Sequence, residues 1–308
     1  MSRVVVAGES LVDLIVDAGG GIRPAAGGGP YNAARTLGRL GIDVAFLGRL
    51  STDRFGREMH GHLAADGVGL SLVVDTDDPT TLALAELDAA GAASYRFYVD
   101  GTSAPGLTLA DARRALTPDL AVLHAGTLGL VLEPMADALA TLVAEAPAGV
   151  LRFIDPNCRP SIVRDEARYR ARLDAVLAHA DVIKVSTDDL DWLVPGTDPV
   201  TWANERLAAG AGAVLITAGG DGVTVVSDAG VLTLPAVRVP VVDTVGAGDS
   251  FGGGFLAWWL DHGLSRAELA DGAALRAATE QAIRVAAITC TRAGAEPPTR
   301  ADLDAFAG

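Results

Sequence analysis

A carboxylate that follows a run of very small residues is the strongest chemical feature of the sequence. The segment Asp243–Leu260 reads DTVGAGDSFGGGFLAWWL, and its apolar second half predicts a helix. Gly246, Ala247 and Gly248 would lie at the N-terminus of that helix, where free N–H groups and the helix dipole attract a phosphate. Asp249 would lie in the first turn beside that phosphate, unless it only caps the helix. The segment therefore predicts an anion site with a neighbouring carboxylate that can accept a proton.

Three further glycines, Gly252–Gly254, lie inside the predicted helix. Each should cost about 1 kcal/mol relative to alanine, so helix stability alone does not explain them. Close packing or the close approach of a ligand explains them better. Upstream of the segment, Val237–Val242 has the composition of a β-strand that leads into the anion site.

The composition of the whole chain limits what such a site can serve. The 308 residues carry a formal net charge of −15, so the average surface repels nucleic acids and anionic lipids. The N-terminus has no basic start or cleavage site, and no apolar run reaches the roughly 18 residues of a membrane-spanning helix. The two cysteines lack the spacing of a disulfide framework or a metal cage. We expect a cytoplasmic protein that acts on small molecules, with neither a nucleic acid nor a membrane as partner.

Alternating strands and helices are expected to position the site. Short apolar runs predict strands, and the segments between many of them predict helices. The predicted strands are Val4–Ala7, Val44–Leu47, Ala121–His124, Val150–Ile154, Val182–Val185 and Ala213–Thr217, and the predicted helices include Ala33–Leu40, Glu133–Glu145 and Ala167–His179. Such alternation favours an α/β fold with a mainly parallel sheet that is covered by helices on both faces.

Two regions depart from this alternation and predict hairpins. Leu11–Val16 followed by a glycine turn, and Leu82–Leu87 followed by Ala92–Val99, each indicate strand, turn, strand. Together they predict a small β-sheet that projects from the main body as a lid, formed by about residues 11–26 and 81–102. Because no long linker interrupts the chain, we expect one domain over residues 1–308.

The segment that contains Asp249 resembles the C-terminal motif of the ribokinase-like sugar kinases, the PfkB family, which runs D-T-x-G-A-G-D-x-F. A second segment, GGGPYNAARTLGRLG at Gly27–Gly41, is similar to the N-terminal motif of the same family. The resemblance covers nearly the whole chain and implies the ribokinase-like three-layer sandwich. It implies that Asp249 is the catalytic base and that the backbone of the three residues from Gly246 to Gly248 forms the anion hole.

On the substrate side, the resemblance places Asp13, Gly28, Gly29 and Asn32 against the sugar. A carboxylate such as Asp13 can accept hydrogen bonds from two hydroxyl groups at once. Arg96, on the predicted lid strand, is a candidate contact for a sugar that carries an acid group.

On the nucleotide side, DPNCRP follows a predicted strand and resembles the family's D-x-N-x-R element. This resemblance places Asn157 and Arg159 near the transferred phosphate, where an arginine can offset developing charge. VIKVSTDDLDWL lies where the family has N-x-x-E, so Ser186 stands in place of the asparagine and Asp189 in place of the acid. That acid acts on magnesium, and we expect the shorter Asp189 to act through a water molecule.

Four more residues are assigned to the nucleotide side. They are Lys184, the only lysine of the chain, and Thr217, Gly219 and Gly222 of the ITAGGDG turn, which resembles the family's T-x-G-x-x-G. Asp243 is a candidate ligand of a monovalent cation, with potassium as the expected ion.

The implied reaction transfers the γ-phosphoryl group of ATP, with Mg²⁺, to a sugar hydroxyl that Asp249 deprotonates. DPNCRPS, KVS and SYRFYVDG look most like fructokinases. A 2-keto-3-deoxygluconate kinase, a ribokinase or nucleoside kinase, and a sugar or nucleotide sensor without catalysis stay open as alternatives. A dinucleotide-dependent dehydrogenase and a P-loop NTPase are excluded, because their glycine motifs are absent. Lid sheets in this family often pair between subunits, so a homodimer through the lid is expected.

Overall fold

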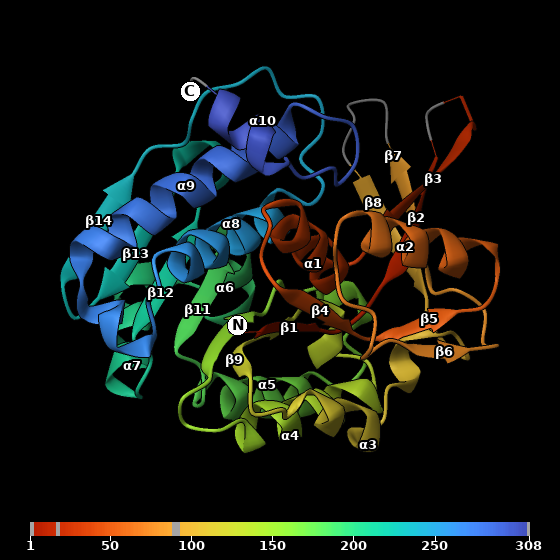
Figure 1. Ribbon diagram of the computed structural model, residues 1–308, viewed down its shortest axis with the longest axis horizontal. Coiled ribbons are helices and arrows are strands. Elements are labelled where there is room, and N and C mark those ends of the chain that lie inside the picture. Colours follow the sequence, from red (N-terminus) through yellow and green to blue (C-terminus); the bar gives the residue numbers. More distant parts are fainter. Residues whose placement is uncertain (1–2, 17–18, 88–92, 307–308) are drawn as a thin grey trace.

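The computed structural model describes residues 3–16, 19–87 and 93–306 of the chain. Its centre is an eight-stranded sheet between two layers of helices (Figure 1). Neighbouring strands are parallel except at one edge, where β13 pairs antiparallel with both of its neighbours. In spatial order the strands are β14 (Gly230–Leu234), β13 (Val223–Ser227), β12 (Ala213–Thr217), β11 (Val182–Ser186), β10 (Leu151–Asp155), β9 (Leu120–Gly126), β1 (Arg3–Ala7) and β4 (Val44–Leu47). The predicted α/β fold with a mainly parallel sheet is confirmed.

Both faces of the large sheet are buried, because successive side chains of each strand point to opposite helix layers. Val4 and Val6 of β1 belong to one apolar core, whereas Val5 and Ala7 belong to the other. The first core is covered by α1 (Gly29–Arg39), α2 (Arg54–Ala65), α8 (Ala247–Asp261), α9 (Gly272–Cys290) and α10 (Arg300–Ala305). The second is covered by α3 (Leu109–Ala112), α4 (Met135–Glu145), α5 (Glu166–Leu177), α6 (Thr187–Leu193) and α7 (Pro199–Ala208). Within the described ranges, none of the helices is both long and apolar enough to cross a membrane.

A separate four-stranded sheet corresponds to the two predicted hairpins (Figure 1). Its strands, in spatial order, are β3 (Ile22–Gly27), β2 (Leu11–Val16), β7 (Leu82–Leu87) and β8 (Ala93–Tyr98). β2 pairs antiparallel with β3, and β7 pairs antiparallel with β8, so both hairpins are confirmed. Residues 17–18 and 88–92, in the two turns, lie outside the described part of the chain. A further parallel pair is formed by β5 (Arg49–Ser51) and β6 (Val74–Thr76).

Close packing explains two of the three glycines inside α8. A Cβ atom at Gly253 would lie 2.7 Å from the Thr36 side chain of α1, and one at Gly254 would lie 2.9 Å from Val285 of α9. Side chains at these positions would push α8 away from its two neighbours, because protein interiors are packed as tightly as organic crystals. The glycines therefore let α8 lie close to both helices.

The β-like run predicted at Val237–Val242 is wrong. The segment is irregular and leads directly into the loop before α8, with Val241 and Val242 62% and 63% exposed. Pro240 lies within it and has no N–H group to donate to a neighbouring strand. The Val242 N–H donates instead to the Cys290 carbonyl oxygen at the end of α9, at 2.8 Å.

The loops that follow the central strands meet at one edge of the large sheet. Because β1, β9, β10 and β11 are parallel, their carboxyl ends lie on the same side, where open α/β sheets bind ligands. The first residues of α1 and α8 line a cavity at this edge together with residues of β2 and β8.

Candidate active site

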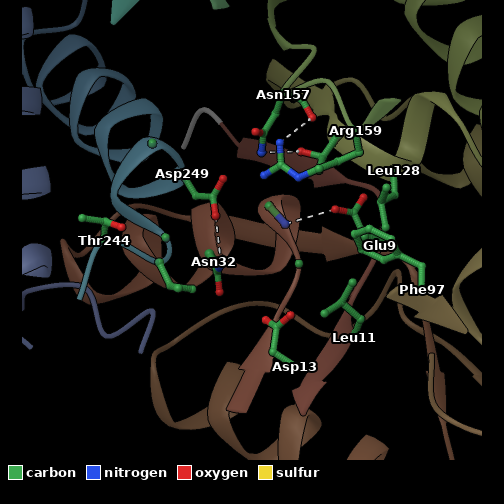
Figure 2. Close-up of a pocket in the computed structure, with 16 residues that line it drawn as sticks. Glu9, Leu11, Asp13, Asn32, Phe97, Leu128, Asn157, Arg159, Thr244 and Asp249 are labelled. Carbon is green, nitrogen blue, oxygen red and sulfur yellow. Dashed lines mark hydrogen bonds between the residues drawn. The ribbon is translucent and has the colours of Figure 1, made fainter. Parts of the chain in front are cut away.

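A cavity of about 310 Å³ lies between the carboxyl edge of the large sheet and the four-stranded sheet (Figure 2). Its polar side chains come from elements that are far apart in the sequence. The main ones are Glu9, Asp13, Asn32, Asn157, Arg159 and Asp249. Five of these six side chains were assigned to the site from the sequence, and Glu9 is the addition. The cavity is also lined by four glycines that the sequence assigned to the site, Gly28, Gly29, Gly246 and Gly248.

Asp249 lies in the first turn of α8 and lines the cavity. Its Oδ2 accepts a hydrogen bond of 2.8 Å from Asn32 Nδ2 of α1 (Figure 2). Burial raises the pKa of the Asp249 carboxyl, although the Asn32 hydrogen bond and the charges of Lys184 and Arg159 act in the opposite direction. A carboxylate with a raised pKa is a better proton acceptor, which is the property a general base needs.

Gly29 shows how closely the two glycine-containing segments at Gly27–Gly41 and Asp243–Leu260 approach each other in space. A Cβ atom at Gly29 would lie 2.4 Å from Thr127 Oγ1 and 3.2 Å from Asp249 Oδ1. No larger residue fits between the base and the loop after β9. The segment at the start of α1 therefore packs directly against the carboxylate of α8.

The N-terminus of α8, where the anion hole is predicted, lies at the cavity. Gly246 adopts the left-handed conformation (φ 76°) and is the N-cap residue, and both Gly246 and Gly248 line the cavity. The Ala247 N–H, however, donates to the Thr244 carbonyl oxygen at 3.2 Å. The N–H groups of the next residues, Gly248 and Asp249, belong to the first turn, which has no carbonyl partner within its own helix. We therefore assign the anion site to these two groups rather than to Ala247.

Two residues on the side of the four-stranded sheet are suited to bind hydroxyl groups. Asp13 of β2 lines the cavity, and burial raises the pKa of its carboxyl to about 6, with Arg159 acting to lower it. Asn32 donates its amide N–H to Asp249, while its Oδ1 is buried without a hydrogen-bond partner among the described residues. Both can accept a hydrogen bond from a polar ligand.

Arg159 and Asn157 reach the cavity from the loop that follows β10. Arg159 Nη1 donates to the carbonyl oxygen of Asn157 at 3.2 Å (Figure 2) and to that of Cys158 at 3.0 Å. Asn157 has a φ of 39° and Thr127, at the end of β9, has a φ of 52°. Such backbone angles are unfavourable for residues with side chains and cluster at functional sites. Here they turn two adjacent strand ends toward the cavity.

Glu9 is a cavity residue that the sequence analysis missed. It follows β1 and is 0% exposed, and its two oxygens accept from the Gly29 N–H at 3.1 Å and the Gly129 N–H at 2.9 Å. Burial raises the pKa of the Glu9 carboxyl to about 7, although these backbone hydrogen bonds lower it, and Asp249 raises it slightly further. Glu9 thus joins the loop before α1 to the loop after β9. The available signal was an acidic residue directly after a buried strand and a glycine.

Lys184, which the sequence analysis assigned to the nucleotide side, does not line the cavity. Its side chain is buried at the end of β11, and its Nζ lies 2.9 Å from Asp155 Oδ2. Successive side chains of a strand point to opposite faces of the sheet. The side chain of Lys184 lies on the face of β11 that points toward α8, next to β10.

Asp189 is buried and has the contacts of a helix cap. Its Oδ2 accepts from the N–H and the hydroxyl of Ser186 at 2.8 and 2.7 Å, and its Oδ1 accepts from the Cys158 N–H at 2.6 Å. Ser186 in turn accepts from the Asp189 N–H, which completes a capping box at the start of α6. Both carboxylate oxygens are therefore used inside the protein, and they hold the loop after β10 against α6.

The other residues assigned to the nucleotide lie further along the same edge of the sheet and do not line the cavity. Thr217 ends β12 and donates to the Val185 carbonyl oxygen at 3.3 Å, and Gly219 and Gly222 bound the turn that follows. Asp243 accepts from the Val245 N–H at 3.0 Å and from the Gly294 N–H at 2.8 Å. It therefore ties the loop before α8 to the loop after α9.

Arg96 lies away from the cavity. It is exposed, and its neighbour Phe97 lines the cavity instead. Successive residues of β8 point to opposite faces of the four-stranded sheet, so both side chains cannot face the same cavity. Arg96, a candidate substrate contact from the sequence, therefore does not face this cavity within one chain.

These features define a class of site. A carboxylate base stands beside an anion site at a helix N-terminus, an arginine faces both, and hydrogen-bond acceptors line the opposite wall. This geometry suits phosphoryl transfer to an alcohol, which depends on positioning and on charge stabilisation.

Comparison with known proteins agrees with this class. The family described as "pfkB family carbohydrate kinase" matches residues 1–302. A fructokinase from Rhizobium leguminosarum bv. trifolii is 36% identical over 258 residues, which cover 82% of this chain and 78% of that protein. A structure of a fructokinase from Xylella fastidiosa with bound ATP has a TM-score of 0.90 and 27% identity, covering 98% of this chain and 97% of that one. A double mutant of the fructokinase from Vibrio cholerae O395, with fructose, ADP and potassium bound, has a TM-score of 0.87 and 28% identity, covering 100% of this chain and 99% of that one.

The chain therefore belongs to the pfkB family of carbohydrate kinases. It is a sugar kinase with the ribokinase-like fold, as the two sequence motifs predicted.

Proposed function

We propose that this protein is an ATP-dependent fructokinase. The observation that carries the proposal is the position of Asp249, whose carboxylate lies in the same cavity as the N-terminus of α8, Asp13 and Arg159. The resemblance to proteins named fructokinases, in sequence and in structure, supports fructose as the acceptor.

The charges in the cavity favour a neutral sugar over an acidic one. Glu9, Asp13 and Asp249 supply three carboxyl groups, whereas Arg159 is the one cationic side chain that lines the cavity within the described residues. A sugar acid such as 2-keto-3-deoxygluconate would bring a further carboxylate, and Arg96 does not face the cavity to balance it. The hydroxyl groups of a neutral sugar instead match the acceptors on Asp13 and Asn32.

In the proposed reaction, Asp249 accepts the proton of the sugar hydroxyl as that oxygen attacks the γ-phosphorus of ATP. The bond from the γ-phosphorus to the bridging oxygen breaks, and ADP leaves with the electron pair. Arg159 and the N–H groups at the start of α8 stabilise the charge on the transferred phosphoryl group. Asp13 and Asn32 orient the sugar, so that one hydroxyl faces Asp249.

The proposal includes a monovalent cation and magnesium, each with a candidate residue. Potassium is named with the Vibrio cholerae structure, and Asp243 stays our candidate for a monovalent cation site. Asp189 does not fit direct contact with magnesium, because both of its oxygens are bonded inside the protein. No group of three or more acidic, histidine or cysteine side chains in the described residues could hold a metal ion by itself. The use of magnesium stays a prediction from the family resemblance, and the proposed reaction contains no step through this ion.

Three further predictions concern the rest of the chain. We propose that residues 1–308 form one domain, that the four-stranded sheet closes over the sugar as a lid, and that two subunits pair through this sheet. Ile22 and Tyr98 of the sheet are 65% and 49% exposed, which is consistent with such pairing. Cytoplasmic location stays a prediction from the sequence, and light scattering of the purified protein tests the dimer.

The test of the proposed function is an assay of sugar-dependent ADP release with a panel of acceptors. Fructose, 2-keto-3-deoxygluconate, ribose and a nucleoside are compared by kcat/KM, and sugar binding is measured separately by calorimetry. We expect fructose to have the highest kcat/KM. Binding without sugar-dependent ADP release would identify a sensor and refute the proposal, and a higher kcat/KM for another sugar would replace fructose as the substrate.

A further inference from the structure

Lys184 is the only lysine among 24 basic residues, and the fold places it behind the anion site. Its side chain and that of Asp155 form an ion pair of 2.9 Å, and the two residues are 3% and 2% exposed. A surface lysine would be replaceable by the arginine that this chain uses elsewhere. A buried lysine at the end of β11 needs a different explanation.

The ammonium group lies against the backbone of α8. A Cβ atom at Gly248 would come within 2.9 Å of Lys184 Nζ, so the missing side chain at Gly248 makes room for the ammonium group. The larger planar guanidinium group of arginine would not fit the same space. Gly248 lines the cavity whereas Lys184 does not, so Gly248 lies next to both the cavity and the ammonium group.

The charges around Lys184 link it to Asp249. Burial lowers the pKa of Lys184, but Asp155, Asp189 and Asp249 outweigh this effect, so its pKa is raised and the ammonium group stays charged. His124 of β9 stays neutral near pH 7, because burial and the charge of Lys184 lower its pKa to about 4.

The carboxyl group of Asp249 is held between two cations and several acids. Lys184 acts on it from inside the protein and Arg159 acts from the cavity, and both favour its charged form. Glu9, Asp13 and Asp155 repel it, and each of these three carboxyl groups has a raised pKa that Asp249 contributes to. Removal of any one of these charges should therefore change the ionisation of Asp249 with a predictable sign.

We propose that Lys184 is a positioning residue for phosphoryl transfer: its buried ammonium group supplies positive charge to Asp249 and to the anion site without contact to either substrate. Asp155 sets the strength of this effect, because it partly neutralises the ammonium group. The proposal rests on the kinase function proposed above, and it explains why a single lysine stands at this position.

Two substitutions with opposite expected signs test the proposal. In Lys184→Met, kcat should fall about 10- to 100-fold while the KM for the sugar changes less than about threefold, since the sugar contacts remain. The acid limb of the pH profile should move to higher pH, so the ratio of kcat at pH 6 to kcat at pH 8 should fall about threefold. In Asp155→Asn the acid limb should move to lower pH, because a negative charge near Asp249 is removed and the lysine is less neutralised.

A measurement without substrates separates this proposal from the proposed function. The ¹³C resonance of the Asp249 carboxyl, assigned by its loss in Asp249→Asn, is titrated in the ligand-free protein. Its midpoint should move up in Lys184→Met and down in Asp155→Asn. If wild type lacks sugar-dependent turnover, the proposed function fails, and this titration still decides the role of Lys184.

A second, partly buried ion pair offers a control. Arg152, on the same strand as Asp155, contacts Asp181 at 3.7 Å near the amino ends of β10 and β11. Arg152→Met also removes a partly buried cation from the sheet, but at the other end of the strand from Asp155. It should lower the melting temperature and leave both kcat and the Asp249 titration unchanged.

Some outcomes would overturn the proposal. Shifts of the same sign in Lys184→Met and Asp155→Asn, no shift in either, or equal shifts in the Arg152 control would each reduce Lys184 to a structural residue. Full activity in Lys184→Arg would contradict the steric part of the argument. Should Lys184→Met fail to fold, the sign of the shift in Asp155→Asn decides, and an upward shift or none refutes the proposal.

Discussion

Two cavities of nearly equal size differ sharply in how their charges are balanced. The cavity beside Asp249 has a volume of about 310 Å³, and a second one, between α5, the loop before α4 and the chain after β8, has about 330 Å³. In the second, Arg164 pairs with Asp100 at 2.8 Å, and Arg172 pairs with Glu133 at 2.5 Å. In the first, none of the carboxyl groups of Glu9, Asp13 and Asp249 forms an ion pair within the described ranges.

The difference teaches that volume alone does not identify the site. Charges that are already paired with each other leave little for a ligand to gain. Buried acids that lack a counter-charge have raised pKa values, as Glu9 and Asp13 show, and they bind groups that supply the missing hydrogen bonds. We therefore propose the cavity with unbalanced charge as the active site, and substitutions in the two cavities should have different effects.

The largest effect is expected from Asp249→Asn. An amide cannot accept the proton of the sugar hydroxyl, so kcat should fall about 10²- to 10⁴-fold. Sugar affinity should be retained, because Asp13 and Asn32 are unchanged. Turnover by the ADP-release assay and sugar binding by calorimetry check both parts, and near-normal turnover would refute the role of Asp249.

The second effect is a dependence on pH that runs in opposite directions for activity and stability. Activity needs Asp13 and Asp249 ionised, and burial raises both of their pKa values. kcat/KM should therefore fall at least about tenfold per pH unit once the pH drops below about 6, the pKa of Asp13. A raised pKa in the folded state means that the folded protein binds protons more tightly than the unfolded chain. The stability that Glu9 and Asp13 contribute is thus present below their unfolded pKa values and is lost as pH rises through about 6 and 7.

Kinetics and thermal melting of the ligand-free protein between pH 5 and 8 measure these two trends. The melting temperature of Glu9→Gln should depend less on pH than that of wild type over the same range. A flat profile of kcat/KM down to pH 5 would contradict raised pKa values in this cavity.

The Glu9→Gln variant should show a smaller change in its kinetic constants. The amide has one acceptor oxygen, so either the Gly29 N–H or the Gly129 N–H loses its partner. An unpaired buried N–H costs about 1–3 kcal/mol. The loop before α1, which carries Gly28 and Gly29, should therefore be held less firmly against the cavity. We expect the KM for the sugar to rise about tenfold, with a smaller change in kcat. An unchanged KM would show that Glu9 has no part in positioning this loop.

The smallest effect on activity is expected in the second cavity. Arg172→Met removes a hydrogen bond to the Leu130 carbonyl oxygen and the ion pair with Glu133. The free energy of unfolding should fall by about 1–3 kcal/mol, as for other buried polar groups that lose a partner. kcat and KM should stay within twofold of wild type. A large loss of activity here would break the distinction between the two cavities.

The sequence predicted the architecture well where local pattern and burial agree. Val44–Leu47 and Ala213–Thr217 form strands with the predicted bounds, because both are apolar runs that end at turns and are buried on both faces. Val237–Val242 is also rich in valine and is not a strand. Its hydrogen bonds depend on the end of α9, which no local pattern reveals.

The candidate site, too, was predictable only where its features are local in the sequence. The motif at the start of α8 identified Asp249, because its chemistry is local to one helix terminus. Glu9 and the Lys184–Asp155 pair depend on contacts between strands that are distant in the sequence. Arg96 and Phe97 are neighbours on β8 and point to opposite faces of the four-stranded sheet. Which of the two faces lines the cavity depends on how this sheet packs, and the sequence of the strand does not reveal it.

The most direct test of the account is a crystal structure with fructose and a non-hydrolysable ATP analogue. It should show one Asp249 oxygen within hydrogen-bond distance of a fructose hydroxyl, with that oxygen in line with the γ-phosphorus and the phosphate at the N-terminus of α8. A structure in which Asp249 is turned away from the sugar, or in which the phosphate binds elsewhere, would contradict it.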